Sequence, residues 1–436
     1  MNKVMDNLTK ESIFYITPDV KRGIGLEGIL PNYHIICTYF DPLIPILRNQ
    51  GANIFCLNEK IGQKAMSFNN SGRLLDDVLV KDYICRNSKR TPHLLVFKPS
   101  IKIDLLCQKE GYVSLVNRAE LNDQFEDKIN FFCLVKKYFP EFQIPGTVGI
   151  LEKLKFDALA KQLGLPFVIQ FSHGWAGKTT FFITDKRDFI QLVSRFPKTT
   201  VKVNKYIDGF TILNNACICD GQVLISPSAI QISNIAELLE KPGVTCGRQW
   251  PARYLTDSQQ EIISKITKKV GIIMHQTGFK GFFGLDFLID KRNGHIFLSE
   301  NNARFTASTP FYTKLELEYS FLPLIYYHLA AFLGKKIPVS YEVESSFVGS
   351  QIIFRNPKID AKLFPNINYG VFQKNGKQLL ESNYYPQNLT KEEFIFIRRT
   401  QKSTKGEDLE LSRIECRGEV LKSENKLKNW IVNLFS

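Results

Sequence analysis

The sequence predicts a multidomain protein of mixed α/β and α+β class, and three observations support this prediction. A length of 436 residues suggests two to four domains. The 44% hydrophobic and 23% charged content is typical of a soluble globular chain that buries large cores. Short strands alternate with helices in the first part of the chain, whereas strands and turns dominate after about residue 340. We therefore expect three domains, over residues 1–125, 126–338 and 339–436.

The first domain is expected to be a small open α/β layer. Its predicted strands cover residues 12–17, 33–38, 51–57, 93–97 and 112–116, and a helix is predicted over 42–49. Gly23-Ile-Gly25 follows the first strand. This pair of glycines is a weak signal for a phosphate loop, and a plain turn explains it better.

The second domain is expected to contain two α+β lobes, and the third to be rich in strands. Predicted helices cover residues 127–139, 156–163, 186–196, 258–278, 315–333 and 427–434. Predicted strands cover residues 167–171, 181–184, 200–206, 211–219, 222–226, 348–354, 369–373, 394–399 and 411–420. The helix over 258–278 is long and amphipathic and leads directly into a hairpin pattern.

Composition favours a cytoplasmic protein that acts on small molecules. The nine cysteines are scattered, odd in number and form no CxxC pair, which favours reduced thiols over a disulfide frame or a zinc site. The first eleven residues lack the apolar core of a signal peptide, and no apolar run approaches the roughly 18 residues that span a bilayer. The net charge of +14 is spread along the chain without a basic block, so binding to nucleic acid or to a membrane is not expected.

The residues 281–304 are predicted to form a β-hairpin with a polar patch. Asp286 lies inside an apolar strand, residues 290–294 have the composition of a turn, and the return strand leads to Glu300, Asn302 and Arg304. Because side chains alternate along a strand, these last three residues share a face, and Asp286 falls opposite residues 298–300. Such a set of oxygen ligands suits Mg²⁺, and the arginine suits a phosphate. The alternative is a solvated hairpin with ordinary ion pairs, although an unpaired buried carboxylate is costly.

A glycine-rich segment, Ser172 to Thr180, lies upstream of the hairpin. Gly177-Lys178-Thr179 matches the end of a Walker A loop. A Walker A loop opens a helix, however, whereas the residues that follow here are β-branched and aromatic and therefore predict a strand. We expect a strand–loop–strand flap that closes over phosphates with its backbone N–H groups.

Together, the flap, the strand after it and the hairpin resemble the ATP-grasp superfamily over about residues 125–335, in its branch of carboxylate–amine ligases and biotin-carboxylase-like enzymes. The resemblance implies that ATP and Mg²⁺ (or Mn²⁺) are the cofactors. It implies that Asp286, Glu300 and Asn302 hold the metal and that Arg304 faces the transferred phosphoryl group. The further nucleotide-binding positions that it implies are Lys128, Gln170, the flap residues Gly174, Gly177 and Lys178, the hinge residues Lys205, Tyr206 and Ile207, and Thr211. Lys178 is also a candidate catalytic residue.

This sequence departs from the pattern of the superfamily at three positions. Gln170 stands where a phosphate-binding lysine is usual, Asn204 replaces an acid before the hinge, and Thr211 replaces a ribose-binding glutamate. A glutamine still donates a hydrogen bond, but it lacks the charge that makes such bonds to a polyanion about twice as strong. A catalytically degenerate nucleotide- or polyanion-binding protein therefore stays open as an alternative.

The activity implied by the resemblance is that of an ADP-forming ligase, in which a carboxylate is activated as an acyl-phosphate and then attacked by an amine. ATP-dependent carboxylation of the biotin-carboxylase type is a second alternative. Substrate identity is open, and the chain is possibly a homo-oligomer. Candidate substrate residues are Arg248, Trp250 and Arg253 in or after the segment Cys246–Pro251, and Thr306, Ser308 and Thr309 after the hairpin; a loop anchored by a buried Trp250 is an equally good reading of that segment.

Overall fold

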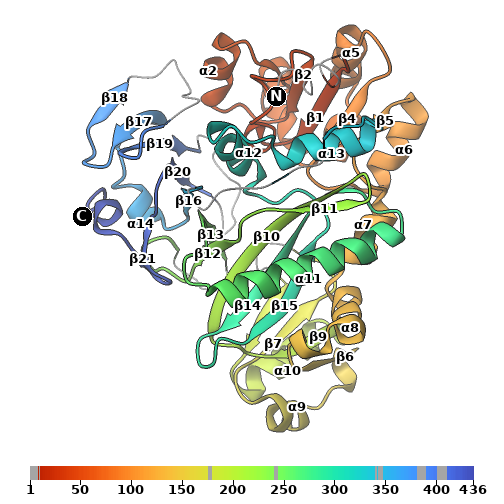
Figure 1. Cartoon of the computed structure of the whole chain (residues 1–436), viewed down its shortest axis with the longest axis vertical. Helices are drawn as coiled ribbons and strands as arrows, with labels where there is room; N and C mark the ends of the chain where they lie inside the picture. Colours follow the sequence, from red (N-terminus) through yellow and green to blue (C-terminus); the bar gives the residue numbers. More distant parts are fainter. Residues whose placement is uncertain are drawn as a thin grey trace.

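The structure is a computed structural model that describes residues 8, 10–174, 179–239, 244–338, 341, 347–380, 389–399 and 410–436. Figure 1 shows the N-terminal layer in red and orange, a small lobe in yellow at the opposite end, and the C-terminal strands in blue at one side. A long helix in green crosses the strands between these parts. Within the described residues, no helix has the length and apolarity that crossing a membrane would require.

The N-terminal domain is built on a five-stranded parallel sheet of order β3-β2-β1-β4-β5, which confirms the predicted open α/β layer. Its central strands are buried along their whole length because helices cover the sheet. The strands are β1 (Ile13–Thr17), β2 (Tyr33–Cys37), β3 (Asn53–Cys56), β4 (His93–Val96) and β5 (Val113–Ser114). The helices are η1 (Val20–Arg22), α2 (Leu43–Asn49), α3 (Asn58–Ile61), η2 (Gly62–Ser67), α4 (Ser71–Leu75), α5 (Val78–Asn87) and α6 (Ile101–Glu110).

A small lobe follows, with an antiparallel sheet of order β6-β9-β7-β8. Helices α9 (Phe156–Leu163) and α10 (Lys186–Arg195) place Leu159, Phe189 and Leu192 in its apolar core. The strands are β6 (Gly146–Ile150), β7 (Phe167–Phe171), β8 (Thr180–Ile183) and β9 (Thr200–Lys205). The remaining elements before or within the lobe are α7 (Ala119–Glu126), α8 (Lys128–Tyr138), η3 (Pro140–Phe142) and η4 (Leu151–Lys153).

The rest of the described chain is organised by one eleven-stranded sheet. Its order is β15-β14-β10-β12-β13-β16-β20-β19-β17-β18, and β11 pairs with β10. Because β13 pairs with β16, the sheet continues across the predicted boundary at residue 338, and the domain limits stay a prediction. The strands are β10 (Gly209–Cys219), β11 (Gln222–Ile225), β12 (Ala229–Ser233), β13 (Thr245–Trp250), β14 (Gly281–Asp290), β15 (Ile296–Asn302), β16 (Gly349–Phe354), β17 (Tyr369–Gln373), β18 (Gln378–Leu380), β19 (Glu393–Arg398) and β20 (Ser412–Cys416). Short elements outside it are α14 (Pro357–Asp360), β21 (Leu421–Ser423), β22 (Lys426–Leu427) and α15 (Asn429–Val432).

Helix α11 (Asp257–Gln276) covers one face of this sheet, as Figure 1 shows for its path across β10 and β14. A capping box formed by Thr256 and Gln259 begins the helix. Ile263, Val270 and Met274 lie fully buried against the sheet, which confirms the predicted amphipathic helix. The opposite face of β10 and β14 carries apolar side chains that pack with α13 (Leu324–Leu333), such as Leu213 and Phe282, and also carries Asp286 of the hairpin.

One predicted helix was wrong, and the loop in one of the two open interpretations of a second segment is corrected. The single helix predicted over 315–333 is two helices, α12 (Thr309–Glu318) and α13 (Leu324–Leu333). The helix stops because Ser320 adopts a positive φ of 60° and Pro323 has no N–H to continue the hydrogen-bond ladder. The segment around Cys246, interpreted as a loop, is the strand β13, and Trp250 at its end is buried in the core.

Candidate active site

The hairpin of β14 and β15 brings the two predicted acids face to face. Asp286 pairs directly with Glu300, and the register then shifts by one residue between Asp286 and Phe287. A bulge of this kind twists the strands locally and re-aims the side chains beside it. The predicted position of Asp286 opposite residues 298–300 is confirmed. We call these two strands the floor of the site.

Asn302 and Arg304 extend the polar patch of the floor. The Asn302 amide donates to Asp286 Oδ2 at 3.1 Å, and Arg304 Nη2 donates to Asn302 Oδ1 at 3.1 Å. Arg304 Nε also donates to Glu126 Oε1, at the end of α7, at 3.0 Å. Arg304 is therefore held in one position by acceptors from two separate elements.

Glu300 is the centre of a wider polar cluster. Lys128, the first residue of α8, places its ammonium 2.5 Å from Glu300 Oε2, and Gln170 of β7 donates to Oε1 at 2.9 Å. Burial alone would raise the pKa of Glu300, but the charges of Lys128 and Lys202 lower it to about 2. Burial raises the pKa of Asp286, partly offset by Arg248. The two facing carboxyls thus have opposite electrostatic surroundings.

The strands on either side of the glycine-rich segment pair with each other, as predicted. Strands β7 and β8 pair antiparallel, and the Phe171 N–H donates to the Thr179 carbonyl at 3.1 Å. Gly174 lies in the loop at a φ of 150°, and a Cβ there would overlap the Thr179 side chain. The predicted residues Gly177 and Lys178 lie outside the described residues. The Lys128 N–H donates to the Ser172 carbonyl at 3.1 Å, so the base of the flap is tied to α8.

The predicted hinge lies beside an apolar cluster. Ile207 is buried with Ile144, Phe297 and the partly buried Leu288. Tyr206 is 40% exposed, and the Lys205 N–H donates to the Pro145 carbonyl at 2.8 Å, so that donor already has a partner.

Thr211 lies between the hinge cluster and the floor acids. It pairs with Leu288 across β10 and β14. Because side chains alternate along a strand, Leu288 and Asp286 share one face of β14. One continuous face therefore leads from the apolar cluster, past Thr211, to the carboxyls of the floor.

Lys202 is a site residue that the sequence analysis missed. It lies on β9 directly beside Gln170, is 1% exposed, and has its ammonium 5.9 Å from the centre of the Phe132 ring. Burial lowers its pKa to about 8, against the opposing effect of Glu300. The available signal was a lysine between two buried valines, Val201 and Val203, which a strand turns to the opposite face. We call β7 and β9, with Gln170 and Lys202, the wall of the site.

Of the candidate substrate residues in and after β13, only Arg248 reaches the floor. Its Nη2 lies 3.7 Å from Asp286 Oδ1. Among the described residues, Arg248 Nε and Asp286 Oδ1 are buried without a hydrogen-bond partner. Trp250 instead packs on Phe311 and Tyr312 in the core, as the alternative reading expected, and Arg253 pairs with Glu419 at the surface.

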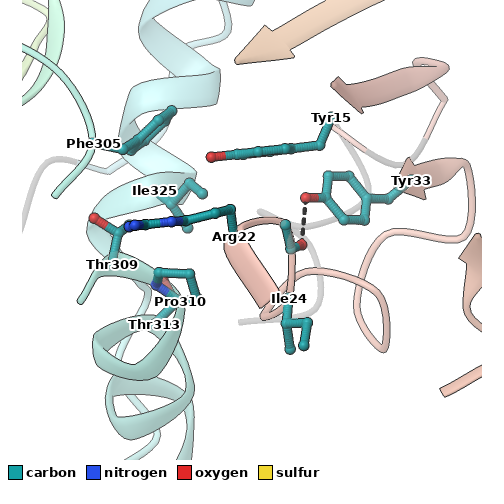
Figure 2. A pocket seen from close by; sticks show the side chains of 10 residues that line it. Tyr15, Arg22, Ile24, Tyr33, Phe305, Thr309, Pro310, Thr313 and Ile325 are labelled. Carbon is teal, nitrogen blue, oxygen red and sulfur yellow. Dashed lines mark hydrogen bonds between the residues drawn. The ribbon is translucent and has the colours of Figure 1, made fainter. Parts of the chain in front are cut away.

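A pocket between the N-terminal domain and the segment after the floor is shown in Figure 2. Arg22 extends into it toward Thr309, below Tyr15 and Phe305, while Tyr33 donates a hydrogen bond of 2.6 Å to the Gly23 carbonyl. The Arg22 Nη1 atom is buried without a partner among the described residues.

Residues around this pocket connect it to the floor. Both Arg22 and Arg304 lie against the ring of Phe97, at 4.6 and 4.8 Å from its centre. Thr306, Ser308 and Thr309 are all buried and hydrogen-bonded inside the fold, and of these three predicted hydroxyl residues Thr309 is the one that lines this pocket.

The side chains of the floor fit a divalent cation whose remaining ligands come from a bound phosphate and water. The described residues contain no group of three His, Cys, Asp or Glu side chains placed to hold a metal by themselves. The floor nevertheless offers two facing carboxyls, an amide oxygen and the orphaned Asp286 Oδ1. Mg²⁺ commonly takes one or two carboxylates and completes its shell with phosphate and water, so this donor set suits it.

Comparison with known proteins finds similarity over the central part of the chain. Residues 127–319 match the family model "Carbamoyl-phosphate synthase L chain, ATP binding domain". The carbamoyl phosphate synthase large chain of Vibrio cholerae is 22% identical over 285 residues, which are 62% of this chain and 25% of that one. The arginine-specific large chain of Geobacillus stearothermophilus is 22% identical over 317 residues, 70% of this chain and 28% of that one. The chain thus spans about a quarter of the length of these curated relatives.

Solved structures extend the similarity beyond the central region. The biotin carboxylase domain of Hydrogenobacter thermophilus 2-oxoglutarate carboxylase, solved with MgADP, ADP and bicarbonate, has a TM-score of 0.60 at 15% identity and covers 93% of this chain and 86% of its own. The ADP complex of Staphylococcus aureus N5-carboxyaminoimidazole synthetase has a TM-score of 0.58 at 14% identity, over 96% of this chain and 93% of its own. At these identities the similarity establishes the fold, and it confirms the predicted mixed α/β and α+β architecture. Residues 127–319 thus match the ATP-binding domain of that family, and the chain as a whole has the fold of these solved structures.

Proposed function

We propose that this protein is an ATP- and Mg²⁺-dependent ligase that activates a carboxylate as an acyl-phosphate for attack by an amine. The observation that carries the proposal is the direct pairing of Asp286 with Glu300 inside a set of fixed cations, Lys128, Lys202 and Arg304. Two acids for a metal and several cations for phosphates are what phosphoryl transfer needs, since its catalysis is mostly positioning and electrostatic stabilisation.

The continuous face of β14 and β10 suggests in which order the parts of a bound nucleotide would lie along it. The apolar cluster at Ile207 and Leu288 suits an adenine ring, which is planar and largely apolar on its faces. Thr211 follows and suits a ribose hydroxyl, and Asp286 and Glu300 then suit the phosphates. Bound Mg²⁺ would supply charge neutralisation at the β- and γ-phosphates, with Asp286, Glu300 and Asn302 as its protein ligands.

The proposed reaction has two balanced steps. A carboxylate oxygen of the first substrate attacks the γ-phosphorus, and the bond from that phosphorus to the β,γ-bridging oxygen breaks, which releases ADP. The amine nitrogen then attacks the acyl carbon, loses a proton, and displaces inorganic phosphate. Arg304 is anchored to Asn302 and Glu126 and is placed to hold the transferred group. The flap that contains Gly174 would exclude water from the acyl-phosphate, with Gly177 and Lys178 as predicted participants.

The region next to the floor supports an anionic acceptor or donor substrate. Arg248 and Arg22 each have a buried nitrogen without a partner among the described residues. Arg22 also lies in the pocket of Figure 2, which is lined by Tyr15, Phe305 and Thr309. A guanidinium fits a carboxylate or a phosphate in a bidentate way, so either group on a small molecule is chemically suited to this place. A homo-oligomer and a cytoplasmic location remain predictions.

The test is a screen for ADP release by purified protein with Mg-ATP against panels of amino acids, small carboxylates, amines and bicarbonate. The expected result is ADP release that requires one acid and one amine together. The matched variants are Glu300→Gln, which should lose at least about 100-fold in turnover, and Glu261→Gln on the exposed face of α11, which should behave as the parent. Full activity of Glu300→Gln would contradict the proposal, and release that depends on bicarbonate alone would support the carboxylase alternative instead.

A further inference from the structure

Lys202 is a buried lysine that has no ion pair of its own among the described residues. It is 1% exposed, and no acidic oxygen of the described residues lies within 4 Å of its ammonium. The ion pair that the structure does give to this cluster joins Glu300 to Lys128 instead. A buried charge without a partner is costly, so a lysine at this position is expected to have a counter-charge that arrives with a ligand.

The side chain of Lys202 lies in a row that runs across the small sheet toward the flap. In register, Val148 of β6, Lys202 of β9, Gln170 of β7 and Thr180 of β8 are successive neighbours. Directly paired side chains point to the same face of a sheet. Gln170 donates to both Thr180 Oγ1 and Glu300 Oε1, so this face looks onto the floor.

Of the two polar neighbours in this row, one is charged and the other is not. Gln170, next to the flap, can donate a hydrogen bond but carries no charge, whereas its cross-strand neighbour Lys202 carries the cation. Helix α8 closes the space from the other side with Lys128 and the ring of Phe132. Two lysines, Lys128 and Lys202, therefore lie near the carboxylate of Glu300 at the junction of floor, wall and flap.

We propose that Lys202 is a phosphate-binding residue of this site and that it supplies, from strand β9, the cation that is absent at position 170 of strand β7. The inference rests on the proposed function, because it assigns the ligand as the β- and γ-phosphates of a nucleoside triphosphate. A purely structural lysine would instead contribute to the packing of the lobe and have no effect on the triphosphate.

The experiment is equilibrium binding of Mg²⁺ with the non-hydrolysable analogue AMPPNP, measured by calorimetry on the full chain. Lys202→Met keeps the length of the side chain and removes its charge. We expect it to weaken binding about 10- to 100-fold, which is the range for losing a charge-assisted hydrogen bond. Lys198→Met, at an exposed lysine just before β9, is the control and should bind as the parent does. Binding of AMPPNP to Lys202→Met with parental affinity would overturn the inference.

A charge exchange separates a binding role from a folding role. The double variant Gln170→Lys, Lys202→Gln returns the cation to the neighbouring strand and is expected to bind AMPPNP within about 3-fold of the parent. Loss of binding by this folded double variant would contradict the inference, and it decides the question if Lys202→Met fails to fold. If the parent protein binds no adenine nucleotide, the proposed function fails together with the inference. If the parent binds and Lys202→Met binds equally, only the inference about Lys202 fails.

Discussion

The floor and the wall of the site differ in the residues that they pair and in how far apart those residues lie along the chain. Each is an antiparallel strand pair that sets two polar side chains directly opposite one another, Asp286 with Glu300 in the floor and Gln170 with Lys202 in the wall. The floor pair is two acids within one hairpin, whereas the wall pair is an amide and a cation on strands separated by strand β8 and helix α10. In the proposed function, the floor would provide the metal ligands and the wall would provide the charge that faces the phosphates.

The comparison also predicts separate effects of mutation. Floor residues are suited to the chemical step, because their carboxyls would act through a metal at the transferring phosphoryl group. Wall residues are suited to binding, because a lysine beside a polyphosphate contributes to its affinity before any bond changes. Variants of the two parts should therefore differ in whether turnover or nucleotide affinity changes more.

The largest expected effect is that of Asp286→Asn in the floor. The change keeps the size of the side chain but removes a carboxylate that faces Glu300, so we expect kcat to fall by about 100- to 1,000-fold. The affinity for AMPPNP without Mg²⁺ should change little, because the lost group is a metal ligand in the proposal. ADP release and calorimetry measure the two quantities. Asp220→Asn, in the exposed turn between β10 and β11, is the control. A parental kcat for Asp286→Asn would contradict the proposed catalytic role of the floor.

A smaller effect is expected for Arg304→Lys. Lysine keeps the charge but cannot reach Asn302, Glu126 and the Phe305 carbonyl at once, as the guanidinium does. We expect kcat to fall by about 10- to 100-fold with a smaller change in KM for ATP. Steady-state kinetics with Arg292→Lys, an exposed residue in the turn of the same hairpin, gives the matched comparison. A rise in KM without a change in kcat would show that Arg304 contributes to nucleotide binding, as proposed for the wall residues, and not to the chemical step.

The stability that His328 gives to strand β14 of the floor is expected to depend on pH. This buried imidazole accepts from the Phe282 N–H of β14 at 2.9 Å and donates to the Leu115 carbonyl of the N-terminal domain at 2.7 Å. Burial lowers its pKa from 6.5 to about 3. Because the folded state has the lower pKa, the stability that the neutral imidazole provides is present above pH 6.5 and is lost as the pH falls toward 3.

The measurement is urea unfolding at pH 7 and pH 5. The part of the loss that His328 causes should be about 2 kcal/mol between these two values, since only the unfolded state takes up the proton there. His328→Gln should lose less stability than the parent over the same interval, whatever its stability at pH 7. An equal loss in both proteins would contradict the prediction, because it would show that His328 takes up its proton as readily in the folded state as in the unfolded state.

The sequence allowed the floor to be predicted more fully than the wall, for a physical reason. Asp286 and Glu300 are joined by one short turn, so strand alternation and turn composition determine which residues face each other. Lys202 meets Gln170 only because β9 returns beside β7 after a helix, and that register depends on the packing of the whole lobe. The same limit explains β13, whose pairing with β12 and β16 joins strands that are distant in sequence. The break before α13 has another explanation. Pro323 indicated that a helix could not continue there, but the apolar residues on both sides suggested one continuous helix.

The most direct test of the central claim, that floor and wall form one nucleotide site, is a crystal structure of the protein with Mg²⁺ and AMPPNP. We expect the adenine beside Ile207 and Leu288, the metal on Asp286 and Glu300, and the ammonium of Lys202 within hydrogen-bond distance of a β- or γ-phosphate oxygen. A structure in which the triphosphate binds elsewhere, or contacts the floor while Lys202 still faces only Phe132 and Glu300, would contradict it.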